Sequence, residues 1–250
     1  MADEANNALK LKMMLINALL MSSAAQAATL TVGPSGSFST ITAAITASTT
    51  GDRIEVAAGT YAENIDLAGK DLDVVGLSGP GSTVLSPPTS GSAVVIYDQG
   101  EAGSLEGFSI LPASDERGFY ILNSSPSITN CRIEEAGDWD SSWGGAVYVS
   151  NGSPIFTDVE FTDNEGARGG DLYATAGANV SLNNVTIDGS AGKYGASIFV
   201  LDAAVSFTNS TVNEPVSQYS GGFAFIEDST LTLNNTQVTD PQGDTSHGVG

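Results

Sequence analysis

The sequence predicts an all-β fold, a single-stranded right-handed parallel β-helix in which the chain winds through stacked coils. A glycine-led apolar phrase recurs every 25–27 residues, and two further short β-type segments follow each of the copies from Gly118 to Gly222 at a steady offset. Turn residues separate the segments, so each coil is expected to contain three short strands. The copies begin at Gly91, Gly118, Gly145, Gly170, Gly195, Gly222 and Gly248.

The second and third segments of each coil have their own signatures. The second segments are Ile128-Thr-Asn130, Phe156-Thr-Asp158, Leu182-Asn-Asn184, Phe207-Thr-Asn209 and Leu233-Asn-Asn235, and the third are anchored on Ile133, Phe161, Ile187, Val212 and Val238. The recurrent Asn tolerates a left-handed backbone at a sharp bend. Its amide can also hydrogen-bond to the equivalent amide of the next coil. Asp158 fits this ladder if a neighbouring amide donates to it.

The start of this region predicts a strand and then a short capping helix. Ala28–Val32 has the composition of a first strand, and Phe38–Ser48 has apolar residues at helical spacing. Ser39 or Thr40 is a suitable N-cap. The apolar positions of this helix are Ile41, Ala44 and Ile45. A helix here would cover the open end of the coil stack, as terminal repeats must.

Residues 1–27 have the order of a secretory signal peptide. Lys10 and Lys12 precede the apolar run Met13–Met21, and Ala25-Gln26-Ala27 fits the A-x-A cleavage pattern. The run is too short to span a bilayer. Residues 28–250 are then expected to form one β-helical domain that is secreted or displayed on a bacterial cell surface. The last residues open a further coil, so the β-helix is predicted to be truncated at its C-terminal end.

Composition excludes several classes of partner. The chain has 8 Lys and Arg against 29 Asp and Glu, a formal charge of −21. This charge argues against nucleic acid and anionic membrane surfaces as partners, because both attract basic proteins. The only cysteine, Cys131, excludes an intramolecular disulfide. Its alignment with Val159 and Val185 predicts a small buried residue.

Acidic residues gather two positions after the apolar anchors of the third segments. This register places Glu135 beside Asp163, and further carboxylates lie in the adjoining loops. Oxygen-rich flexible loops suit calcium. The predicted calcium site consists of Glu135, Asp138, Asp140, Asp163 and Glu165. The alternative interpretation is a solvated acidic lip without a metal. No other cofactor is predicted.

The longest turn, Glu134–Trp143, contains both tryptophans of the chain, Trp139 and Trp143. Aromatic side chains beside carboxylates are typical of surfaces that stack on sugars. These two side chains are candidate glycan contacts. Alternatively, both fold back and cover the flank of the coil.

Two stretches resemble known families. Residues 29–85 resemble the opening of pectin methylesterases and the wider pectin-lyase-like superfamily, through Gly36, Phe38, Gly59-Thr-Tyr61-Ala-Glu63-Asn64 and Val75-Gly76. This resemblance implies architecture, since the stretch is mostly the N-terminal cap. Residues 118–250 resemble the repeats of polymorphic outer membrane proteins, through Gly144-Gly-Ala-Val147 and Phe161-Thr-Asp-Asn164. That resemblance implies an exported passenger that acts in adhesion.

The motifs that carry catalysis in pectin methylesterases, Q-D-T-L and D-F-I-F-G, do not occur here. The leading hypothesis is therefore a non-enzymatic β-helix repeat protein that contacts extracellular glycans or a host or neighbouring cell surface. The alternative is a carbohydrate-active enzyme, a polysaccharide lyase or pectin-esterase-like protein, whose catalytic residues lie on later coils. A third possibility is a structural spacer module.

Overall fold

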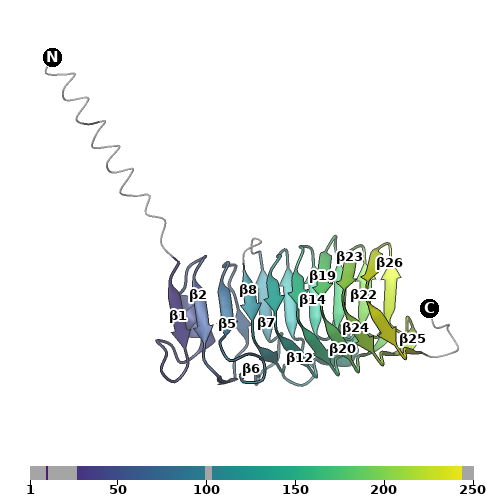
Figure 1. Cartoon of the computed structure of the whole chain (residues 1–250), viewed down its shortest axis with the longest axis horizontal. Helices are drawn as coiled ribbons and strands as arrows, with labels where there is room; N and C mark the ends of the chain where they lie inside the picture. The colour runs from purple at the N-terminus through teal and green to yellow at the C-terminus, as the bar shows by residue number, and fades with distance from the viewer. Residues whose placement is uncertain (1–9, 11–26, 99–102, 244–250) are drawn as a thin grey trace, which may run out of the picture.

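The computed structural model describes residue 10, residues 27–98 and residues 103–243. Of the predicted signal peptide, residues 1–9 and 11–26 lie outside the described residues, as does the predicted truncation at the last residues. Coils of parallel β-structure stack along the long axis of the molecule (Figure 1). The fold is the predicted right-handed parallel β-helix. Among the described residues, no helix has the length and hydropathy needed to cross a membrane.

Four sheets run along the stack, here named A to D. Sheet A contains β1 (Thr29–Val32), β2 (Arg53–Val56), β5 (Asp73–Gly76), β8 (Ser104–Glu106), β11 (Ser127–Thr129), β15 (Ile155–Thr157), β19 (Asn179–Asn183), β23 (Ala204–Thr208) and β27 (Thr230–Asn234). Sheet B contains β3 (Gly59–Tyr61), β6 (Thr83–Leu85), β9 (Ser109–Ile110), β12 (Arg132–Glu134), β16 (Glu160–Thr162), β20 (Thr186–Asp188), β24 (Thr211–Asn213) and β28 (Gln237–Thr239).

The other two sheets complete each coil. Sheet C contains β4 (Ile65–Asp66), β7 (Val94–Tyr97), β10 (Phe119–Leu122), β14 (Val147–Ser150), β18 (Leu172–Thr175), β22 (Ile198–Leu201) and β26 (Ala224–Glu227). Sheet D contains β13 (Gly137–Trp143), β17 (Glu165–Arg168), β21 (Ala191–Tyr194), β25 (Val216–Ser220) and β29 (Gln242–Gly243). Sheets A, B and C correspond to the three segments expected from the repeat. Sheet D adds a fourth strand to the coils from β13 onwards, where the sequence pattern predicts only turns.

The predicted register between coils is confirmed. On sheet B, Ile133 pairs with Phe161, and the ladder continues through the other three anchors. On sheet A, Ile128 pairs with Phe156, and the ladder continues through the second segments in the same way. Equivalent apolar side chains of successive coils therefore stack in the interior, where most are fully buried.

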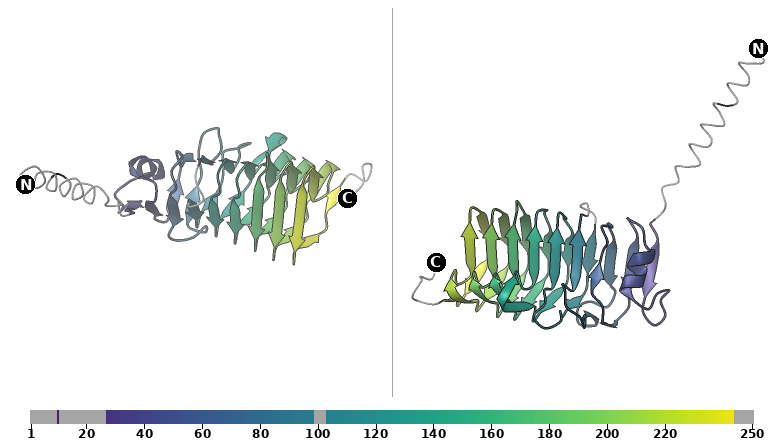
Figure 2. Two further views of the ribbon diagram at one scale, coloured as in Figure 1. Left: turned by 90° about the horizontal axis from the view of Figure 1, so that it is seen from above. Right: turned by 180° about the vertical axis from the view of Figure 1, so that it is seen from behind.

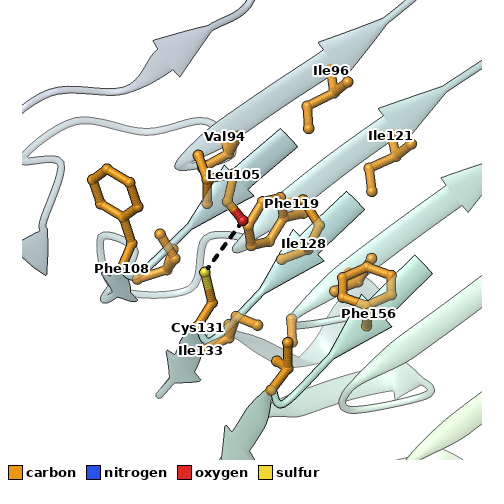
Figure 3. Packing of buried hydrophobic residues seen from close by; sticks show 14 of the residues in the cluster. Val94, Ile96, Leu105, Phe108, Phe119, Ile121, Ile128, Cys131, Ile133 and Phe156 are labelled. Carbon is orange, nitrogen blue, oxygen red and sulfur yellow. Dashed lines mark hydrogen bonds between the residues drawn. The ribbon is translucent and has the colours of Figure 1, made fainter. Parts of the chain in front are cut away.

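Figure 3 shows this interior around Cys131, between Leu105, Ile128 and Ile133. Only 2% of Cys131 is exposed, as its alignment with valines predicts. Burial raises the pKa of the Cys131 thiol to about 12. The thiol is therefore neutral at physiological pH and acts as a small core residue.

The recurrent Asn lies at a left-handed bend after sheet A, as expected. The φ angles are between 47° and 55° for Asn130, Asp158, Asn184, Asn209 and Asn235. Asn235 Nδ2 donates to Asn209 Oδ1 at 2.7 Å, and Asn184 Nδ2 donates to the carboxylate of Asp158. The carboxylate at Asp158 is thus accommodated in the ladder by an amide donor of the next coil.

The predicted capping helix is α2 (Ile41–Ala47), which lies beside the first strands at the N-terminal end of the stack (Figure 2). Thr40 is its N-cap and accepts from the Ala43 amide at 3.2 Å. The Glu63 carboxylate also accepts from the backbone amides of Ile41 and Thr42, at 2.8 and 2.9 Å. At the other end, Lys70 Nζ donates to carbonyl oxygens of the last turn. Opposite charges therefore stabilise the two ends of the helix dipole.

Replacing Glu63 with alanine is expected to lower the free energy of unfolding by about 1–2 kcal/mol, because two amides of the first turn of α2 lose their acceptor. Glu106→Ala is the control, since Glu106 is exposed and lies on the outer face of sheet A. Denaturation midpoints of the two variants and the parent check this prediction. Equal midpoints for both variants would show that Glu63 does not hold the cap.

Candidate functional site

Sheet C presents a column of aromatic rings on its outer face. Residues alternate along each strand, so Phe119 and Ile121 point into the core and Tyr120 points outwards. The register of sheet C brings the outward ring of each coil beside that of the next. Ring centroids are 4.7–5.4 Å apart and neighbouring ring planes differ by only 6–16°. This aromatic column consists of Tyr120, Tyr148, Tyr173, Phe199 and Phe225.

A second row of side chains lies over this column, and we name it the outer ridge: Arg117, Trp143, Arg168 and Tyr194. The last three end strands β13, β17 and β21, and they are paired in register. Each ridge side chain contacts the ring one coil further along. Arg117 lies 5.2 Å from the centroid of Tyr148, Trp143 stacks on Tyr173 at 5.4 Å, and Arg168 lies 5.3 Å from Phe199. Tyr194 meets Phe225 edge-on at 6.0 Å.

Glycine turns place the ridge over the column. Gly144, Gly169 and Gly195 each follow a ridge residue and have φ between 61° and 66°. At Gly169 a Cβ atom would lie 2.1 Å from the carbonyl oxygen of Leu172, so no other residue fits without a shift of the backbone. This tight left-handed turn leads the chain from sheet D directly into sheet C. The recurrent glycine phrase therefore determines which side chains reach the aromatic column.

The two tryptophans occupy different environments. Trp143 packs on Tyr173 and beneath the guanidinium of Arg168, 4.6 Å from its ring, yet 44% of the residue remains exposed. The ring of Trp143 is therefore packed against its neighbours and still accessible to solvent. Trp139 is half-buried in the middle of β13. The structure does not bring the two rings together on the aromatic column.

The two arginines of the ridge are held differently. Arg117 donates from Nε to the Gly144 carbonyl and from a terminal nitrogen to the Trp143 carbonyl, both at 2.9 Å. These bonds fix the turn that precedes sheet C. The guanidinium of Arg168 lies over the rings of Trp143 and Phe199, and no hydrogen bond or ion pair joins it to another described residue.

A shallow hollow of about 140 Å³ opens beside Arg168. Aromatic rings from three elements form its walls, and one carboxylate lies at its edge. It is lined by Arg168, Tyr194, Phe199, Leu201, Phe225 and Glu227. The hollow joins apolar ring surface to both a hydrogen-bond donor and an acceptor, which is the composition of a small polar-ligand site.

The residues of the predicted calcium site are only partly brought together. Glu135, Asp163 and Glu165 line one open hollow of about 460 Å³. Asp138 instead accepts from Ser141, whose hydroxyl lowers the pKa of Asp138, and Asp140 pairs with Lys193 at 2.7 Å. Among the described residues, no three His, Cys, Asp or Glu side chains are arranged to hold a metal ion. Calcium binding stays a prediction.

A buried polar cluster lies inside the coils where sheets B and D approach sheet C. Asn164 Nδ2 donates to Asp171 Oδ1 at 3.0 Å, and the hydroxyls of Ser190 and Ser197 are 2.6 Å apart. All four residues are at most 1% exposed. Burial raises the pKa of Asp171 to about 7, and the neighbouring polar side chains offset only part of this effect. Asp171 is enclosed, so it cannot touch a polymer outside the β-helix.

The comparison with family models agrees with this architecture. Residues 81–240 match the family described as "Right handed beta helix region", and the chain belongs to this family. The structure is similar to a pectin methylesterase from carrot, with 13% sequence identity, a TM-score of 0.41, and coverage of 86% of this chain and 85% of that chain. No curated protein matches the sequence. The predicted right-handed parallel β-helix is confirmed as a fold.

Proposed function

We propose that this protein is an exported, non-enzymatic β-helix that contacts glycans through the outer face of sheet C. The aromatic column under its ridge of arginine and aromatic side chains carries the proposal. Within it, 44% of Trp143 and 38% of Tyr194 are exposed although both rings are held by other rings. Rigid, partly exposed aromatic rings contact the apolar faces of sugars at little entropic cost.

The shape of this face favours an extended ligand. Five outward rings follow one another at one ring per coil, so the column spans four coil spacings, roughly 19 Å along the axis at about 4.8 Å per spacing. Tyr173 and Phe199 are only 2% and 4% exposed beneath the ridge, so over these two coils a ligand would meet the ridge side chains instead. A face of this length and flatness suits an oligosaccharide chain that lies along the β-helix. The candidate glycan contacts therefore keep Trp143 and shift from Trp139 to Tyr194 and the partly exposed rings of the column, Tyr120, Tyr148 and Phe225.

The non-enzymatic role is supported by what the described residues offer chemically. Burial raises the pKa of both the Asp171 carboxyl and the Cys131 thiol, and both side chains are enclosed in the coils. General acid catalysis requires contact with the scissile bond. The alternative hypothesis, a carbohydrate-active enzyme, places its catalytic residues on later coils.

Replacing Trp143 or Tyr194 with alanine is expected to weaken glycan retention about tenfold or more, because each removes an exposed ring from the face. Immobilised neutral and acidic polysaccharides, with retention measured by affinity electrophoresis, provide the test. Ile155→Ala is the matched control, since Ile155 is also 44% exposed but lies on sheet A. Its retention should equal that of the parent.

Three results would contradict the proposal. Failure of every polysaccharide to retain the parent would favour the spacer module. Retention equal to the parent in both aromatic variants would place the contact elsewhere. Release of shortened or de-esterified sugar would identify an enzyme.

A further inference from the structure

We infer that Arg168 makes the sheet C face selective for glycans that carry an oxyanion, a carboxylate or a sulfate ester. This inference rests on the proposed function and adds the chemical class of the ligand. Three features support it: the partners of the other basic side chains, the contacts that hold Arg168, and the hollow beside it.

Six Lys and Arg side chains lie between residues 27 and 243, and five of them have polar partners. Arg53, Arg132 and Lys193 pair with carboxylates. Lys70 and Arg117 donate to backbone carbonyls. Within the described ranges, Arg168 has neither a carboxylate nor a carbonyl partner for its guanidinium. It is thus the one arginine of this face whose five donors remain available for a ligand.

The position of the Arg168 guanidinium is nevertheless fixed. It lies 4.6 Å from the centroid of Trp143 and 5.3 Å from that of Phe199. Two such contacts orient a planar guanidinium and remove part of its water. A planar donor fork held in this way is suited to bidentate bonds with a carboxylate or a sulfate. Little side-chain freedom is then lost when the ligand binds.

The hollow beside Arg168 provides the space for such a group. Tyr194, Phe199 and Phe225 line it with ring surface, and Glu227 lies at its edge. A sugar in this hollow would contact a ring, give its acidic group to Arg168 and donate a hydroxyl to Glu227. The carboxylate of Glu227 would repel a second negative charge in the hollow. A bound sugar with one acidic group therefore fits this arrangement.

The overall charge of −21 does not prevent this recognition. At about 0.15 M ionic strength, exposed charges beyond roughly 8 Å are largely screened. The nearest charges therefore dominate at the hollow, and they are Arg168 and Glu227. The low total of basic residues makes the single unpaired guanidinium the determinant of selectivity.

The test compares three soluble polymers with the same sugar backbone: neutral, carboxylated and sulfated. We expect the parent to bind at least one acidic polymer about tenfold more tightly than the neutral one. Arg168→Gln should reduce this preference, measured as the ratio of acidic to neutral binding in the same variant, to within about twofold. Arg168→Lys keeps the charge without the fork and should recover only part of the preference.

Arg132→Gln is the matched control, because Arg132 is a surface arginine on sheet B that is already paired with Glu134 and Glu160. It should keep the parent preference. Comparing the affinity for the carboxylated polymer with the affinity for the sulfated polymer shows which of the two oxyanions is preferred. Equal binding of all three polymers, or an unchanged preference in Arg168→Gln, would overturn the inference and leave the glycan contact standing. Binding of no polymer by the parent would overturn both.

Discussion

Replacing Gly169 with alanine is expected to lower the free energy of unfolding by about 3–5 kcal/mol, or to prevent folding. Gly169 has φ +66°, and a left-handed backbone alone costs an alanine about 1–2 kcal/mol. The added Cβ would also lie 2.1 Å from the Leu172 carbonyl oxygen and 2.8 Å from the Phe199 amide nitrogen. Both contacts are with backbone atoms, so relief requires movement of the turn between sheets D and C.

The matched control is Gly177→Ala. Gly177 has φ +77°, but a Cβ added there would meet no atom within 4 Å, so only the left-handed cost applies. Chemical denaturation of both variants measures the difference, which should be about 2–3 kcal/mol. Equal destabilisation would mean that the turn is not tightly packed and that the ridge is not fixed over the aromatic column.

The second large effect concerns the pH dependence of stability at Asp171. Burial raises the pKa of this carboxyl to about 7 in the folded state, from 3.8 for an ordinary aspartate. The folded state therefore holds the proton more tightly than the unfolded state. The contribution of the protonated Asp171 carboxyl to the free energy of unfolding is complete below about pH 3.8, and it is lost as pH rises to 7. This difference corresponds to roughly 4 kcal/mol.

Asp171→Asn is expected to remove this dependence, because the amide has a similar shape and stays neutral. The free energy of unfolding of the variant minus that of the parent should increase by roughly 4 kcal/mol between pH 4 and pH 8. Asp188→Asn is the control, since Asp188 is exposed on sheet B. Urea denaturation at several pH values checks the prediction. A variant-minus-parent difference that stays constant with pH would contradict it.

The repeat and its register could be predicted from sequence because stacking demands equivalent residues at equivalent positions. The anchors Ile133 and Phe161 pair as aligned, and Asp158 receives its amide donor from Asn184. The capping helix was also predictable from the spacing of Ile41, Ala44 and Ile45. The roles of Glu63 and Lys70 at its ends were not, since both lie more than twenty residues away along the chain from the groups they bind.

Sheet D could not be predicted from hydrophobic periodicity. Its inward positions are small, with Gly166, Gly192 and Ser217 in one register, so no apolar residue marks the strand. Backbone pairing with the neighbouring coils forms these strands in the absence of an apolar pattern. The sequence pattern therefore predicts turns for these residues, and it does not predict that Asp138 accepts from Ser141 or that Asp140 pairs with Lys193.

The repeat phrases contain the residues of the aromatic column, but the phrases alone do not show that these residues form one surface. One aromatic residue occurs in each copy at the outward position, from Tyr120 to Phe225. Aligning the copies by strand register would reveal the column. The ridge could not be found in this way, because its side chains belong to sheet D and reach the column one coil further along.

The fluorescence of Trp143 tests the glycan contact most directly. In the Trp139→Phe variant, Trp143 is the only tryptophan, and its partly exposed ring lies on the proposed face. Titration with the polysaccharide that retains the parent protein should shift the emission of Trp143 and protect Trp143 from acrylamide quenching. The midpoint of both changes should equal the dissociation constant of the polysaccharide. Saturable binding that leaves both the emission and the quenching of Trp143 unchanged would contradict the assignment of this face.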